Sequence, residues 1–273
     1  LRKYEGEQKN LYANIIYQSI ISSTLHTFKT GASYMLDEYD EMYSASLAKD
    51  SSFKRTESVP GVFGEYTYND EEKYSSVIGM RGDLHNLYGI FLSPRLHLKY
   101  NFLPLSAIRF SIGRGYRRPN IFVENSTVLA SSRQVVIEQN VQPEIAWNGG
   151  ISITHKFQIA KKDAVFNADF FRTEFENQVV VDLENAREVR FYNLQGKSFS
   201  NSFQVDFSFE PIKKLDVKTS YKWYDVKTTF HSGLKSKPLV PKNRALFNIG
   251  YTTKYDKWKF DATLQWYGIS RLP

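Results

Sequence analysis

Cysteine is absent from all 273 positions of the sequence. Its absence excludes disulfide bonds, thiolate metal sites and thiol catalysis. No apolar run reaches the ~18 residues that a membrane-spanning helix requires. The opening Leu1-Arg2-Lys3-Tyr4-Glu5 also lacks the apolar core of a signal peptide. We therefore expect the chain to be an interior or processed part of a longer protein.

Motifs of enzymes and of nucleic-acid-binding proteins are missing as well. The sequence has no glycine-rich phosphate loop, no HExxH and no GxSxG. Its net charge is +7, but the lysines and arginines are scattered, whereas a nucleic-acid surface concentrates them beside a recognisable module. We predict that the chain is not an enzyme, has no catalytic residues, needs no cofactor and binds no nucleic acid. Periodicity alone leaves open a barrel enzyme with catalytic side chains near its rim.

The sequence is rich in strands of alternating character. In 203–210 every odd position is apolar and every even position is polar or charged, and the pattern returns in 215–223, 247–251 and 260–266. Because side chains alternate between the two faces of a strand, these segments predict a sheet with one apolar and one wet face. Such a sheet is either a soluble sandwich or a membrane barrel.

Connection lengths distinguish these two architectures. Short and long connections alternate along the chain, which is typical of outer-membrane barrels with tight periplasmic turns and longer external loops. Several segments have ten or more residues, as a tilted membrane strand needs, and aromatic residues lie near their ends. The sequence therefore predicts an all-β fold, an antiparallel transmembrane β-barrel segment. About twelve strands are expected, at 8–21, 23–36, 59–69, 73–84, 90–102, 106–116, 144–159, 164–181, 190–210, 215–229, 243–255 and 258–270.

No metal site is predicted. The five histidines share no metal-like spacing, and we expect His85 and His231 to be ordinary residues in or near loops rather than haem ligands. The acidic run 37–41 enters a predicted external loop, 37–58. It matches no calcium loop, so we expect solvated charge there instead of a bound cation.

One segment, 111–120, ends a strand and enters a long irregular stretch. Pro119 removes a backbone donor and stops the ladder, and three arginines gather at this point. The cluster suits an anionic ligand or an acidic plug, and equally contact with lipid headgroups or solvent. The residues themselves leave these readings open.

The chain resembles the barrel of a TonB-dependent outer-membrane receptor of the Bacteroidetes type. The resemblance covers most of 90–273 and more loosely 1–89, and it implies a barrel of about 22 strands with an N-terminal plug. About twelve strands would form part of it, so we expect residues 1–273 to be one barrel region without the plug and without the last strand or strands. The residues that carry the resemblance are Gly113-Arg114-Gly115-Tyr116-Arg117-Arg118-Pro119-Asn120, 129–133, Gln142-Pro143-Glu144, Trp147-Asn148-Gly149, 175–178, 191–194 and 210–211.

The resemblance implies an outer-membrane transport receptor. It would lie among outer-membrane lipid, bind a small scarce solute at its external face and import it with energy from a periplasmic TonB-type partner acting on the plug. Compact loops favour a siderophore, another metal chelate or a cobalamin-like solute. A glycan importer of the same superfamily, a passive porin and a soluble β-sandwich binding module are the alternatives. Candidate substrate-binding residues are Tyr116, Arg117, Asn120, Asn125 and Arg133.

Alternation also assigns the two faces of the wall. Phe203, Val205, Phe207 and Phe209 are expected to face lipid, because a charge at the bilayer midplane costs about 2–4 kcal/mol. Residues expected to face the lumen are Arg95, His97, Lys99, Asn101, Asn148, Ser152, Thr154, Lys156, Gln204, Asp206, Ser208, Lys218, Lys222, Asp261 and Gln265.

Overall fold

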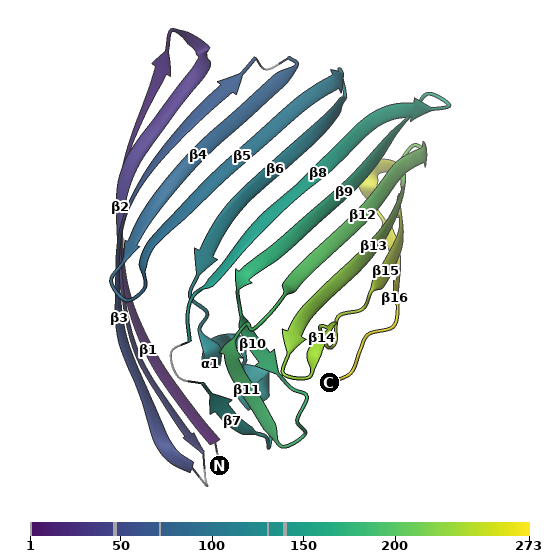
Figure 1. The fold of residues 1–273 in the computed structure, drawn as a ribbon. Helices are drawn as coiled ribbons and strands as arrows, with labels where there is room; N and C mark the ends of the chain where they lie inside the picture. Colours follow the sequence, from purple (N-terminus) through teal and green to yellow (C-terminus); the bar gives the residue numbers. More distant parts are fainter. Residues whose placement is uncertain (1, 46–47, 71, 130, 139–140) are drawn as a thin grey trace.

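Twelve long strands form one antiparallel sheet that follows chain order and curves into an open trough (Figure 1). The computed structural model describes residues 2–45, 48–70, 72–129, 131–138 and 141–273. No helix in these ranges is long and apolar enough to cross a membrane. The wall strands are β1 (Arg2–Ile21), β2 (Ser23–Ala45), β3 (Ala48–Asn69), β4 (Tyr74–His85), β5 (Gly89–Leu103), β6 (Ser106–Arg117), β8 (Glu144–Ile159), β9 (Lys162–Asn177), β12 (Ser198–Ile212), β13 (Leu215–Phe230), β15 (Asn243–Thr252) and β16 (Lys259–Tyr267).

Each predicted strand corresponds to one wall strand, so the prediction of about twelve strands is confirmed. The predicted loop 37–58 is wrong, because β2 continues to Ala45 and β3 begins at Ala48. The β2 extension pairs residue by residue with β1 on one side and with the β3 extension on the other, which satisfies its backbone groups although Glu38 and Asp40 on its outward face are charged.

Two other predicted strands are each broken. The segment 164–181 divides into β9 and β10 (Val179–Asp182), and 190–210 divides into β11 (Glu188–Asn193) and β12. Gly196, at a φ of 137°, lies in the second break, in a conformation that few other residues adopt. Alternation continues across both breaks, which is why it gave no signal for them.

The connections after β1, β3, β5, β8, β12 and β15 are short and lie at one end of the wall, drawn at the top of Figure 1, whereas the connection after β4, at 86–88, is also short but lies at the opposite end. At Ala160 and Lys161 the backbone has positive φ, as tight hairpin turns require. In another turn the Asp70 carboxylate accepts from the N–H groups of Lys73 and Tyr74, each at 2.7 Å, and these backbone hydrogen bonds lower the pKa of Asp70. The longer connections lie at the opposite end, which we call the external end.

Register places the polar residues on one face. Paired residues in an antiparallel sheet share a face, and one continuous row joins Lys99, Arg109, Ser152, Asp169 and Gln204. All the lumen-facing positions predicted from alternation lie on this face by the same register, and we call it the interior face.

The opposite, outward face is apolar and uncovered. Phe203, Phe170, Ile151 and Phe110 form one row across four strands, and all four are exposed. A soluble sandwich would cover this row with a second sheet, and the described part of the chain supplies none. The outward row is the surface that a barrel presents to lipid.

A small three-stranded sheet lies at the external end, in the mouth of the trough (Figure 1). It comprises β10, β11 and β7 (Gln134–Ile137), with β7 parallel to β11. Val179, Val189 and Phe191 are buried in its core. The remaining elements are α1 (Ile121–Glu124), α2 (Ser126–Leu129), β14 (Gly233–Ser236), which pairs with β13, and a short 3-10 turn at Lys254–Asp256.

Candidate functional site

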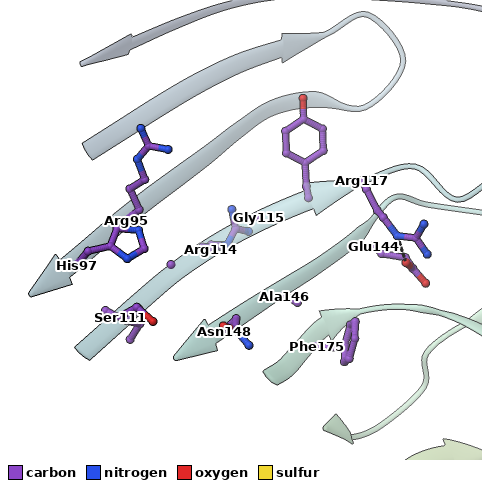
Figure 2. Close-up of a pocket in the computed structure, with 13 residues that line it drawn as sticks. Arg95, His97, Ser111, Arg114, Gly115, Arg117, Glu144, Ala146, Asn148 and Phe175 are labelled. Carbon is purple, nitrogen blue, oxygen red and sulfur yellow. Dashed lines mark hydrogen bonds and ion pairs between the residues drawn. The ribbon is translucent and has the colours of Figure 1, made fainter. Parts of the chain in front are cut away.

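A hollow of about 440 Å³ lies on the interior face near the external end of the wall (Figure 2). Gly113, Gly115 and Ala146 contribute almost no side chain to it, and a Cβ at Gly115 would meet no atom within 4 Å. Small residues on neighbouring strands therefore create this space. Its other lining includes Arg95, His97, Asn148, Phe175 and two predicted site residues, Tyr116 and Arg117.

Arg117 is held between two carboxylates. Its guanidinium donates to Glu124 at 2.9 and 3.0 Å and to Glu144 at 2.8 Å, where the dashed line in Figure 2 marks the pair. Glu144 also accepts from the backbone N–H of Val179 at 3.1 Å, which joins the wall to the small sheet. The Arg117 side chain nevertheless remains 58% exposed, so it can still donate to a ligand.

Tyr116 stacks on Phe91, with ring centroids 3.9 Å apart and an angle of 9° between the planes. Arg95, across the hollow, is paired with Glu65 and keeps 54% of its side chain exposed. The hollow thus has a ring stack at one side and exposed guanidinium donors at two others. Such donors suit oxygen-rich anionic groups.

Asn120 and Asn125 cap α1. The Oδ1 of Asn120 accepts from the N–H of Val123 at 3.4 Å, and the Nδ2 of Asn125 donates to the carbonyl of Ile121 at 2.8 Å. Side chains of this type satisfy the unpaired backbone groups at helix ends. Neither asparagine lines the hollow, and both are committed to the local structure of the connection.

Arg133 lies farther along the same connection. Its Nη1 donates to the carbonyl of Leu183 at 3.4 Å, beside the small sheet. The structure therefore brings Tyr116 and Arg117 to the hollow and places Arg133 elsewhere. A binding role for Asn120, Asn125 and Arg133 stays a prediction.

A second charged cluster lies on the interior face of β2, β3 and β4. Glu57 accepts from Arg55 at 2.9 Å and from Arg118 at 2.9 Å, and the Nε2 of His85 lies 3.6 Å from it. Arg55 also pairs with Glu41. Both carboxylates and the imidazole are buried. The sequence analysis predicts a loop at 37–58 and therefore no such cluster, although Arg55 and Glu57 already show the spacing of one strand face.

The acidic run 37–41 is divided between the two faces of β2. Asp37 and Glu41 are buried on the interior face, whereas Glu38 and Asp40 are exposed on the outward face. The expectation of solvated charge thus holds for only half of the run. Carboxylates on opposite faces cannot surround one cation, and among the described residues no group of three or more metal-binding side chains is found.

The connection after β6 folds over the interior face of the first strands. Phe122, in α1, packs against the rings of Tyr4, Tyr43 and Phe53 at centroid distances of 5.5, 5.4 and 5.2 Å. Together with the pair between Arg118 and Glu57, this ring cluster ties a loop to strands that lie far away in the sequence.

A single curved sheet with a polar interior face, an apolar outward face and all long connections at one end defines the wall of an outer-membrane β-barrel. Residues 4–272 match the family model of the TonB-dependent receptor-like β-barrel, and the chain belongs to this family. Barrels of this family are outer-membrane proteins, which places the chain in the cell outer membrane.

Solved structures agree with this fold. The ferric enterobactin receptor PfeA from Pseudomonas aeruginosa is 15% identical with a TM-score of 0.70, over 96% of this chain and 41% of that one. The copper transporter OprC is 12% identical with a TM-score of 0.72, over 97% and 44%. The siderophore receptor PirA from Pseudomonas aeruginosa is 12% identical with a TM-score of 0.64, over 95% and 48%. The chain thus spans less than half the length of these relatives. No curated protein matches its sequence.

Proposed function

We propose that residues 1–273 form part of the barrel of an outer-membrane receptor for active transport. The receptor binds a scarce solute at its external end, a siderophore or other metal chelate, or a cobalamin-like solute. It imports the solute with energy from a periplasmic TonB-type protein, which acts through a plug domain elsewhere in the protein.

The hollow at the external end is the observation that carries this proposal. It lies on the interior face, where a solute entering the barrel passes, and it combines the ring stack of Tyr116 and Phe91 with two exposed guanidinium groups. Glu65, Glu124 and Glu144 neutralise these guanidinium groups, so hydrogen-bond donors rather than net positive charge favour the ligand.

Deeper on the interior face, cations stand opposite one another. Lys99 pairs in register with Arg109, and Lys222 with Arg244. Like charges directly opposite destabilise a sheet, and within the described ranges none of the four makes an ion pair with a carboxylate. A passing anion would relieve this repulsion, which favours an anionic solute such as a metal chelate over a neutral glycan.

The structural relatives point the same way. Their titles concern ferric enterobactin, a siderophore and copper. Sequence identities of 12–15% indicate a shared fold only. The ligands in these titles therefore support the proposal without determining the solute.

Growth of a strain that lacks the full-length gene tests the proposal. We expect the deletion to slow growth on one defined iron or vitamin source and the gene to restore it. Arg95→Ala together with Arg117→Ala in the full-length protein should lower uptake about tenfold, the equivalent of losing ~1.4 kcal/mol of binding. Arg172→Ala, an exposed arginine that is paired with Glu174 and does not line the hollow, is the matched control.

Two outcomes would contradict the proposal. Uptake that continues without the TonB-type protein would indicate a passive porin. A growth defect confined to oligosaccharides would indicate a glycan importer.

A further inference from the structure

A second hollow, also of about 440 Å³, lies on the outward face of the same wall. Gly64, Met80 and Pro94 are consecutive register partners on β3, β4 and β5, and Leu96 and Ile112 pair on β5 and β6. Because Arg95 lies on the interior face, its neighbours Pro94 and Leu96 point outward. The lining on this side is apolar and ends at Trp147.

The groove exists because side-chain volume is missing at its floor. A Cβ at Gly64 would meet no atom within 4 Å, whereas Met80 beside it is large and exposed. Pro94 has no N–H to give to β6, and the pairing of β5 with β6 stops at Arg95 and Gly113. The wall therefore has a long recess between its outward side chains.

Arg114 is the register partner of Trp147 and lies beside the external end of this groove, and it also contributes to the lining of the interior hollow (Figure 2). Arg114 donates to Glu176 from Nε and Nη2, at 2.9 and 2.7 Å, and to the carbonyl of Leu92 from Nη1 at 2.8 Å. Trp147 donates to the same Glu176 at 2.9 Å. These bonds use three of the five N–H groups of a guanidinium. The other two have no partner in the described structure, and the side chain is 20% exposed.

We propose that this groove is a lipid-binding site. It holds one acyl chain of an outer-leaflet lipid, and the phosphate of that lipid accepts from the two remaining N–H groups of Arg114. This proposal concerns the outward face and does not depend on the transported solute.

Three observations favour this occupant. The groove opens onto the face that meets lipid, so acyl chains are the surrounding solvent. The side chains that line an unfilled recess lose dispersion contacts. Moving an acyl chain from the surrounding lipid into the groove brings no hydrophobic gain, so close packing determines which molecule remains bound. Trp147 and Arg114 stand at the external end, where an indole and a guanidinium match the level and the chemistry of a phosphate head group.

Native mass spectrometry of the full-length protein in mild detergent tests the site, with lipid A as the added probe. Gly64→Leu fills the floor of the groove and should lower the fraction of lipid-bound protein about tenfold, equivalent to ~1.4 kcal/mol. Gly82→Leu is the matched control. Gly82 is also an outward-facing strand glycine, its Cβ would make only an ordinary 3.6 Å contact with Leu92, and it does not line the groove.

Arg114→Gln tests the head-group contact in a variant that leaves the groove open. The parent protein should prefer lipid A to its dephosphorylated form, and this variant should lose the preference while still binding both. Equal lipid binding by the Gly64 and Gly82 variants would show that the lipid is only part of the general annulus and would overturn the site. Equal binding of both lipid forms by the parent protein would overturn the role of Arg114.

Discussion

The wall and the small sheet at its external end are both built from β-strands, but the wall exposes apolar side chains on its outward face whereas the small sheet buries them. In the wall, Ile15 is 78% exposed, whereas Val189 in the small sheet is 0% exposed. The wall is one sheet thick and meets lipid on its apolar face, so backbone pairing and lipid hold it together. The small sheet lies in the mouth of the trough, away from the outward face, and is held together by a packed core, as in a soluble domain.

Truncation of the small-sheet core should have the largest effect. We expect Phe191→Ala to destabilise the small sheet by about 3–5 kcal/mol, because the ring is fully buried and its loss leaves a cavity. Hydrogen exchange should rise in 178–197 and stay unchanged in the wall. Ile15→Ala is the control and should leave exchange unaltered. Equal effects of the two changes would refute the contrast between the regions.

A charge introduced on the outward face should lower the free energy of unfolding of the wall. Phe203→Lys should cost about 2–4 kcal/mol if the residue lies near the bilayer midplane. Ser202→Lys, one position away on the interior face, should cost much less, since its register partners Phe171 and Tyr224 are uncharged. Urea unfolding in lipid vesicles measures both. A smaller cost at 203 than at 202 would reverse the assignment of the faces.

The smallest effect is expected from pH at the external end. Hydrogen bonds from Lys235, opposed by partial burial and reinforced by Arg271 and Ser232, lower the pKa of Glu184 to about 2. The folded state lowers the pKa of Glu184, so the ionised Glu184 stabilises the fold. This contribution to stability is complete above the unfolded pKa of 4.5 and is lost as the pH falls towards about 2.

Glu184→Gln should remove that pH dependence, at a cost of about 1 kcal/mol or less for a partly exposed pair. Thermal unfolding of the external segment between pH 5 and pH 2 provides the measurement. Unchanged pH dependence in this variant would mean that other carboxylates are responsible.

Alternation predicted the wall well because it is a local property. Phe203 and Gln204 face opposite sides whatever the rest of the chain does, so strand identity, face and approximate count could all be read from neighbouring residues. The candidates Tyr116 and Arg117 came instead from the point where a predicted strand enters the long irregular segment after 111–120. Alternation failed at 37–58, where charged residues on both faces of extended strands looked like a loop.

The candidate site depended on contacts that no local pattern reports. Phe122 packs against Tyr4, Tyr43 and Phe53, and Arg118 forms an ion pair with Glu57. These partners are distant in sequence and meet only because the register of the wall brings their strands to one side. Likewise, β7 joins β11 as a parallel neighbour, a pairing between two separate connections.

The sequence by itself determined a two-faced sheet of about twelve strands, because side-chain direction along a strand is fixed by backbone geometry. Only the tertiary structure decided where that sheet leaves space. The interior hollow over Gly113 and Gly115 and the outward groove over Gly64 both arise from small residues whose neighbours on adjacent strands are set by register. Register is a long-range property, and it determines which residues surround each glycine and therefore whether a hollow forms there.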